Sequence, residues 1–259
     1  MSFRHLGFAL FLLLSLAAAI GEAHGQAVHR IEQRRENFQS GGRNIRVETF
    51  APKEPGRYPA VLVLHSAAGM LAGKRELVDF SRQLAARGHV AFLVHYFHRT
   101  GTLIAGDRAI AELPPVWIET VRHAVDFASA HPKVNRESIG IFGFSLGAYL
   151  AVAESSLDPR VDAVVEVAGG IFEGFEPRMR RVPAMLILHG RADERVPVVR
   201  AFELQKAARP LGATPQVKIY DGEGHRLSKA AAQDAAQRAL SFFHEHLTSR
   251  RKTGSPRPR

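Results

Sequence analysis

Short apolar runs alternate along the chain with longer segments in which apolar residues recur every three or four positions. The run at 59–64, PAVLVL, is continuously apolar and bounded by turn residues, which is typical of a strand buried on both faces of a parallel sheet. The segment at 74–87 follows it and places Leu77, Phe80 and Leu84 on one helical face. This pattern predicts a strand followed by an amphipathic helix.

The same order of strand and helix repeats to the end of the chain. Strands are predicted at 44–50, 59–64, 89–94, 138–142, 163–167, 184–188 and 217–220, and helices at 74–87, 116–130, from 146, 198–208 and 230–247. Such alternation favours an α/β fold with a mostly parallel central sheet, because right-handed crossovers put helices on both of its faces. The first of these strands is expected at an edge of the sheet.

Two segments fit this rhythm poorly, namely 95–115 and 169–181. Both come directly after predicted strands. In open α/β sheets the carboxyl ends of the strands carry the ligand crevice, so these segments are expected to shape a substrate pocket.

The first 27 residues have the layout of a secretory signal peptide. A basic residue, Arg4, precedes an apolar run at 6–20, and small residues follow it near a cleavage point. A run of this length is shorter than the roughly 20 residues that span a membrane, which favours removal over anchoring. We therefore expect a signal peptide at 1–27, one α/β domain at 28–248 and no stable membrane insertion. The mature protein is predicted to be exported, either periplasmic or secreted.

Composition and charge narrow the function classes. The 35 Lys and Arg residues exceed the 25 Asp and Glu residues by ten, but five basic residues lie at 250–259 among Thr, Gly, Ser and Pro. This predicts a basic disordered tail at 249–259 rather than a nucleic-acid site. The absence of cysteine excludes disulfides, thiolate zinc sites and a cysteine nucleophile. No predicted strand is followed by G-x-G-x-x-G, and His95 and His98 have no zinc-type spacing, so neither a cofactor nor a metal is expected.

The sequence GFSLG at 143–147 carries the first candidate for chemistry. It lies between a predicted strand and a predicted helix, which is the context of a nucleophile elbow, G-x-S-x-G. The flanking glycines are required because side chains there would collide with the neighbouring strand and helix. Ser145 is therefore the predicted nucleophile. The main-chain N–H of Leu146, together with that of Ala67 in the loop after 59–64, is expected to form the oxyanion hole.

A serine hydroxyl needs a base, and the base needs a carboxylate to orient it. Asp193 follows the strand at 184–188, and His225 follows the strand at 217–220. The three residues thus occur in the order nucleophile, acid, histidine, each on a loop at the end of a strand. Glu194 and Glu166 are alternative acids.

Five short motifs then indicate a family. They are HSAAG at 65–69, YFHRTGT at 96–102, GFSLGA at 143–148, HGRADERVP at 189–197 and GEGH at 222–225. With them the chain resembles the α/β-hydrolase superfamily and, within it, the dienelactone hydrolase-like group. The resemblance implies an α/β-hydrolase fold and favours Asp193 as the acid. Dienelactone hydrolases proper use a cysteine nucleophile and an oxyanion-loop glutamate, where this chain has Ser145 and Ser66, so the resemblance implies a general ester or lactone hydrolase.

Other residues are singled out by the motifs or by their places after predicted strands. Tyr96 and Arg99 are candidates for binding substrate, and Arg99 could receive a substrate carboxylate or be a surface residue. His65 and His189 are interpreted as loop-packing residues. The expected partner is a small-molecule ester or lactone. The alternatives are a serine peptidase, an acyltransferase or a catalytically silent binding protein on the same fold.

Overall fold

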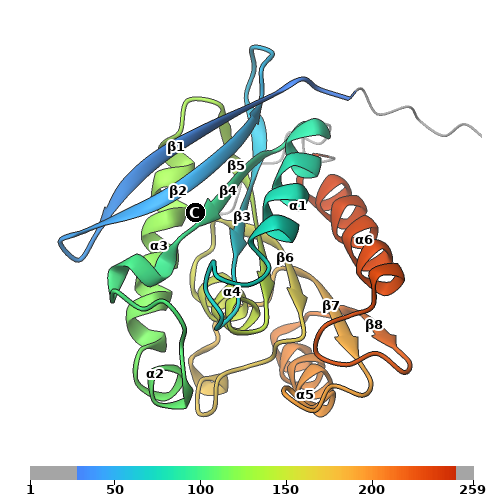
Figure 1. The fold of residues 1–259 in the computed structure, drawn as a ribbon. Coiled ribbons are helices and arrows are strands. Elements are labelled where there is room, and N and C mark those ends of the chain that lie inside the picture. The colour runs from blue at the N-terminus through green and yellow to red at the C-terminus, as the bar shows by residue number, and fades with distance from the viewer. Residues whose placement is uncertain (1–27, 249–259) are drawn as a thin grey trace, which may run out of the picture.

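In the computed structural model, which describes residues 28–248, eight strands form one sheet in the order β1-β2-β4-β3-β5-β6-β7-β8 (Figure 1). The expected signal peptide and basic tail lie outside the described residues. The strands are β1 Ile31–Ser40, β2 Arg43–Pro52, β3 Tyr58–Leu64, β4 Val90–Val94, β5 Val134–Phe144, β6 Val161–Val167, β7 Ala184–Gly190 and β8 Gln216–Tyr220. The six strands from β3 to β8 pair in parallel, while β1 and β2 are antiparallel. The predicted α/β fold with a mostly parallel sheet is confirmed.

Helices cover both faces of this sheet and enclose a separate apolar core on each. The helices are α1 Lys74–Ala86, α2 Asp107–Glu112, α3 Pro114–Ala130, α4 Leu146–Leu157, α5 Val199–Ala208 and α6 Lys229–Thr248, with 3₁₀ turns η1 Tyr96–Arg99, η2 Glu176–Arg178 and η3 Arg209–Leu211. One core packs α3, α4 and α5 against the sheet, with Trp117 and Leu150 fully buried. The other packs α1 and α6 against the opposite face through Leu84 and Phe243.

The first strand, β1, was not predicted, and the expectation of an edge strand at 44–50 was wrong. The strand there, β2, lies between β1 and β4, and β1 forms the edge. Most of β1 is polar and solvent-facing, so it lacks the apolar alternation by which strands are recognised. Gly41 and Gly42 join the two strands, and both have the positive φ that a two-residue hairpin turn requires, 49° and 73°.

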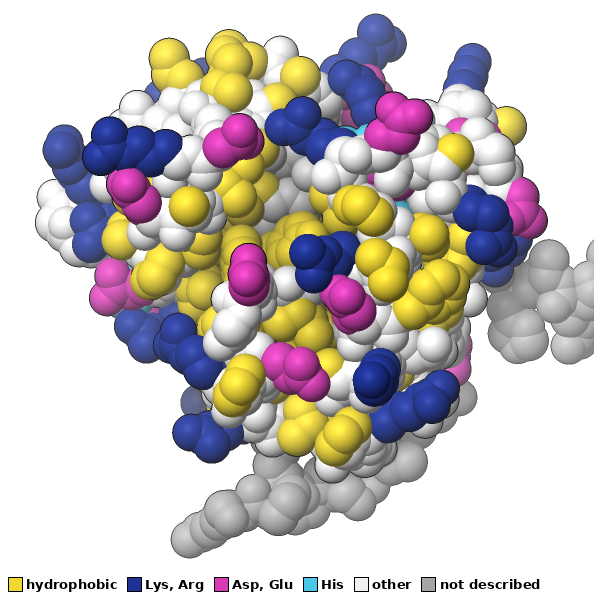
Figure 2. Space-filling view, turned by 90° about the horizontal axis from the view of Figure 1, so that it is seen from below, with side chains coloured by type: hydrophobic (Ala, Val, Ile, Leu, Met, Phe, Trp, Pro, Cys, Tyr) yellow, Lys and Arg dark blue, Asp and Glu magenta, His cyan; other side chains and the backbone are white. Residues whose placement is uncertain are grey.

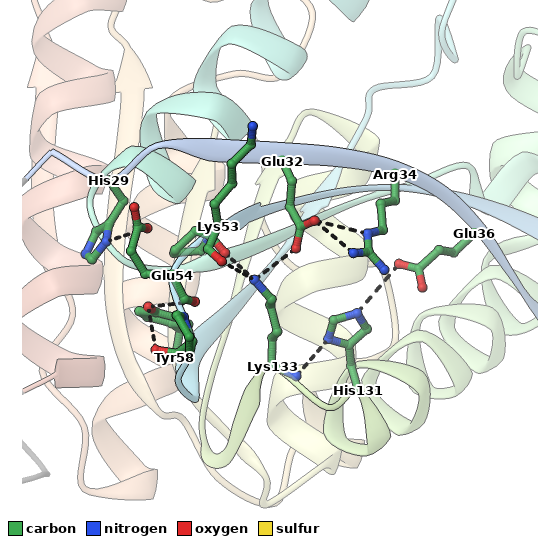
Figure 3. Close-up of polar contacts among 11 residues, drawn as sticks. His29, Glu32, Arg34, Glu36, Lys53, Glu54, Tyr58, His131 and Lys133 are labelled. Atoms are coloured by element: carbon green, nitrogen blue, oxygen red, sulfur yellow. Dashed lines mark hydrogen bonds and ion pairs between the residues drawn. The ribbon is translucent and has the colours of Figure 1, made fainter.

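Polar contacts from the segment between α3 and β5 hold this hairpin in place (Figure 3). The ammonium group of Lys133 lies 2.9 Å from a carboxylate oxygen of Glu32 on β1 and donates to the carbonyls of Pro52 and Lys53. Nε2 of His131 lies 3.7 Å from Oε2 of Glu36, on the same strand. These partners are distant in sequence, which explains why no local pattern indicated β1.

The strand register brings the loops that matter for function to one edge of the sheet. Leu64 of β3 pairs with Gly143 of β5, and Val167 of β6 pairs with Leu188 of β7. The loops after β3, β5, β6 and β7 therefore leave the sheet side by side. Between residues 28 and 248, no helix has the length and apolar character needed to cross a membrane.

Candidate active site

Ser145 occupies a strained turn between β5 and α4. Its φ of 54° and ψ of −120° lie outside the regions that a residue with a side chain normally adopts. The turn is anchored by the Ser145 N–H, which donates to the Val167 carbonyl at 2.8 Å. A Cβ at Gly143 would lie 2.2 Å from the Gly147 carbonyl oxygen, and one at Gly147 would lie 2.5 Å from the carbonyl oxygen of His65. The two glycines are therefore required by close backbone approach.

The structure brings Ser145, His225 and Asp193 into one chain of hydrogen bonds. Nε2 of His225 lies 3.0 Å from the Ser145 Oγ, and its Nδ1 lies 2.8 Å from Oδ2 of Asp193. Because a carboxylate only accepts, Nδ1 must carry the ring proton, which leaves the Nε2 lone pair facing the serine hydroxyl. This tautomer is the one that can take a proton from Ser145.

The carboxylate of Asp193 is held by the main chain of its own loop. Its side chain is fully buried, and Oδ1 accepts the N–H groups of Arg195 at 2.9 Å and Val196 at 2.8 Å. The Ala192 N–H donates to the Glu223 carbonyl at 2.9 Å, which ties this loop to the loop of His225. The acid and the imidazole are thus fixed relative to each other before any ligand binds.

Of the alternative acids, neither adjoins His225 in this way. Glu194 is exposed. Glu166 is fully buried in β6, where its Oε2 accepts the Gly169 N–H at 2.8 Å, and burial raises its pKa to about 8. Glu166 is therefore neutral at pH 7 and pins the loop after β6.

A cavity of about 420 Å³ opens beside Ser145. Figure 2 looks onto the face toward which β6, β7 and β8 point in Figure 1, and shows an apolar hollow with charged side chains around it. The apolar walls come from Ala67, Ile110, Leu146, Tyr149, Ile171, Phe172 and Val196, and the charged lining residues are Asp107, Glu173, Arg195 and Arg200. Both segments that were expected to shape a pocket, 95–115 and 169–181, contribute to it.

Leu146 and Ala67, the residues predicted to form an oxyanion hole, both line this cavity next to Ser145. Leu146 is the first residue of α4, so its N–H belongs to the positive end of that helix. Ala67 lies in the loop after β3, which is tied down by a 2.8 Å hydrogen bond from the Ala105 N–H to the Ala67 carbonyl.

Comparisons with known proteins agree with this architecture. Residues 45–247 match the family described as "Dienelactone hydrolase family". The chain belongs to the dienelactone hydrolase family. It is 23% identical over 218 residues to a carboxymethylenebutenolidase of Rhodococcus opacus, covering 76% of this chain and 85% of that protein. It is 28% identical over 158 residues to acyl-coenzyme A thioesterase 1 of Rattus norvegicus, covering 60% of this chain but only 33% of the thioesterase.

A solved dienelactone hydrolase from Anabaena variabilis shares the fold, with a TM-score of 0.68 and 18% sequence identity over 85% of this chain and all of that one. The family places this chain among hydrolases with an α/β-hydrolase fold. The roles of individual residues have to be argued from the site itself.

In this dienelactone hydrolase family member, neither Tyr96 nor Arg99 lines the Ser145 cavity, contrary to the expectation that they bind substrate. Tyr96 is fully buried beneath the loop after β3, where its hydroxyl donates to the His65 carbonyl at 2.8 Å. Arg99 is directed toward α3, where its guanidinium lies 3.6 Å from Glu119. Both residues belong to η1, and their contacts lie with the loop after β3 and with α3.

The aromatic wall of this cavity was not predicted from the sequence. The rings of Tyr149 and Phe172 lie 5.1 Å apart, and burial raises the pKa of Tyr149 to about 12, so its hydroxyl stays protonated. A signal for Tyr149 was present, because it follows Ser145 by four residues and therefore shares its face of the helix. Among residues 28–248, no His, Asp and Glu side chains gather into a set that could hold a metal ion.

Proposed function

We propose that this protein is an exported serine hydrolase that cleaves a carboxylic ester or lactone through an acyl-enzyme. One observation carries the proposal, the chain from Ser145 Oγ through His225 to Asp193, with distances of 3.0 Å and 2.8 Å, whose serine lines a cavity with apolar and charged walls. A serine hydroxyl facing a histidine in the matching tautomer, with a carboxylate that orients that histidine, is the arrangement that acyl transfer uses. A binding protein does not require this arrangement.

The reaction proceeds in two balanced halves. Ser145 Oγ bonds to the substrate carbonyl carbon while its proton passes to Nε2 of His225, and the carbonyl oxygen becomes an oxyanion that receives the N–H groups of Leu146 and Ala67. The oxyanion collapses, the bond to the alcohol oxygen breaks, and that oxygen takes the proton from His225. Water then attacks the acyl-enzyme with the same base, releasing the acid and restoring Ser145.

The substrate class follows from the walls of the cavity and from the family. Aliphatic and aromatic side chains form most of the lining, so an apolar acyl or alcohol group can be buried there while the reacting carbonyl meets Ser145. The carboxymethylenebutenolidase and dienelactone hydrolase relatives support lactones and esters. A serine peptidase or acyltransferase would use the same three residues, and differs in the leaving group or in the acceptor.

Fluorophosphonate labelling with mass spectrometry tests the chemistry directly. We expect one adduct, on Ser145, in the mature protein. Ser145→Ala should abolish the adduct and lower kcat on short-chain aryl esters by about three orders of magnitude or more, with an unchanged circular dichroism spectrum. Hydrolysis that persists in Ser145→Ala would refute the assignment. Activity on esters and lactones but not on peptide amides would separate this function from that of a peptidase.

Export is the second part of the proposal and rests on the sequence of residues 1–27. Expression of the full chain in a bacterium, followed by fractionation and N-terminal sequencing, should find a periplasmic protein whose chain begins near residue 26 or 28. A cytoplasmic protein with Met1 retained would contradict it.

A further inference from the structure

His189, the penultimate residue of β7, lies fully buried behind Asp193 and takes no part in the proposed reaction. Its Nε2 lies 2.8 Å from the carbonyl oxygen of Val196. A carbonyl oxygen can only accept a hydrogen bond, so Nε2 must carry the ring proton. The tautomer of His189 is therefore opposite to that of His225, which carries its proton on Nδ1.

The contact of His189 with Val196 completes a clamp around the acid. Val196 donates its N–H to Oδ1 of Asp193 at 2.8 Å and accepts from His189 through its carbonyl. The turn that follows Asp193 is thus held at Val196 through both main-chain groups of that residue, its N–H and its carbonyl. Nε2 of His189 also lies 3.4 Å from Oδ2 of Asp193, the oxygen to which His225 donates. The carboxylate is placed between two imidazole rings.

The other nitrogen of His189 shows that this ring does more than fill space. Its Nδ1 is buried and has no hydrogen-bond partner among the described residues. Burying an unpaired acceptor costs free energy that an apolar side chain of similar size would avoid. This free-energy cost is offset at Nε2, whose N–H group donates to the Val196 carbonyl and lies next to the negative charge of Asp193.

We propose that His189 is a positioning residue for the catalytic acid: its Nε2–H fixes the turn from Asp193 to Val196 and presents a partial positive charge to Oδ2. The proposal rests on the proposed function, because Asp193 matters for turnover only if His225 is the base. Among the titratable groups of the described chain, His189 and His225 contact Asp193, and Tyr149 is close enough to interact with its charge.

Two amide variants of similar polarity separate this role from simple packing. In His189→Gln the amide nitrogen can reach the position of Nε2, whereas in His189→Asn it reaches only the position of Nδ1. We expect His189→Asn to lower kcat by about tenfold to a hundredfold with KM changed by about twofold at most, and His189→Gln to stay within about threefold of the natural protein. His246→Asn, on the last turn of α6, is the matched control and should change neither constant.

The pH profile gives a readout that a packing defect would not move. Without the N–H group of His189 beside Oδ2, the negative charge of the Asp193 carboxylate interacts more strongly with His225 and stabilises the imidazolium form of that residue. The rise of kcat/KM with pH should therefore shift to higher pH in His189→Asn and return in His189→Gln. Equal impairment of both variants, or an unchanged profile in His189→Asn, would overturn the proposal.

Nuclear magnetic resonance of the His225 ring, recorded in a Ser145→Ala background, makes the test independent of turnover. The titration midpoint of the His225 resonances should move to higher pH when His189→Asn is added, and an unmoved midpoint would reject the role of His189 even in an active esterase. If the natural protein neither hydrolyses esters nor takes a fluorophosphonate, the proposed function fails. A shift of the midpoint would still show that His189 controls the pair formed by Asp193 and His225.

Discussion

Two hollows among the described residues differ in what their buried polar groups do. The cavity beside Ser145 has a volume of about 420 Å³, whereas a groove between α3 and α4 reaches about 710 Å³. In the groove the charged side chains pair with one another, as Arg160 does with Asp158 at 2.5 Å. Its more deeply buried carboxyl group, that of Glu154, has an oxygen without a partner among the described residues. In the larger hollow, therefore, the polar side chains described here do not converge on one point where a substrate could react.

The two hollows show that a candidate site is marked by where the fold directs donors, acceptors and backbone strain, and less by volume. Asp193 receives two main-chain N–H groups and an imidazole, and Ser145 is held at a positive φ. Glu154 receives no comparable set, and burial, reinforced by the charge of Asp158, raises its pKa to about 8. One carboxyl group is thus held by the main chain beside an imidazole, while the other is mostly neutral at pH 7.

The largest expected effect tests whether only the organised carboxylate supports turnover. In Asp193→Asn the amide would present an N–H to the histidine or favour its wrong tautomer, so we expect kcat on an aryl ester to fall about 10³-fold to 10⁴-fold. Glu154→Gln is the matched acid-to-amide control in the other hollow and should stay within about twofold. Comparable losses in both variants would remove the distinction between the two sites.

The sequence predicted the organised site because its parts follow the periodic pattern of the fold. Ser145, Asp193 and His225 each lie on a loop that follows a predicted strand, so parallel topology alone brings their loops to one edge. Tyr96 also follows a strand, but in a segment without a period, where the direction of a side chain depends on tertiary packing. Its hydroxyl is turned inward because the His65 carbonyl is the acceptor available to it.

The edge strand β1 escaped prediction for a related reason. All ten of its residues pair with β2, and its further contacts with Lys133 and His131 come from far along the chain, while its own residues are mostly polar and little buried. A local pattern reports which face of an element is buried, and a mostly polar strand at the edge of a sheet buries little. The opposite tautomers of His189 and His225 were unpredictable for the same reason, since both depend on partners brought together by folding.

A smaller effect should appear in stability as a function of pH. The folded-state pKa of Glu154 is raised to about 8 from an ordinary value of 4.5, so between these values the unfolded chain releases a proton that the folded protein keeps. Unfolding is then favoured as pH rises, by about 1.4 kcal/mol per pH unit. Glu154→Gln removes this titration and should gain stability over the natural protein from pH 5 to pH 8, by at most about 4 kcal/mol.

Urea unfolding of both proteins at pH 5 and pH 8 measures this difference. Glu166, whose pKa burial also raises to about 8, is present in both proteins and cancels in the comparison. A gap between the two proteins that is the same at both pH values would show that Glu154 does not titrate in this range, and the contrast with Asp193 would then need another explanation.

The smallest effect concerns the support behind the Ser145 cavity. Tyr96→Phe removes the hydroxyl that donates to the His65 carbonyl at 2.8 Å, two residues before Ala67, while the ring can still stack on the His65 imidazole, whose centroid is 4.0 Å away. Burial raises the pKa of Tyr96, so the phenol is a donor at every pH at which the protein works. The variant leaves a buried carbonyl unpaired and should lower the free energy of unfolding by about 1–2 kcal/mol.

Because the loop retains its hydrogen bond from Ala105, we expect kcat to fall only about twofold to fivefold, with KM unchanged. A loss of stability without any loss of kcat would show that the oxyanion loop is positioned by Ala105 alone, and that the organisation of the cavity ends at its first layer of residues.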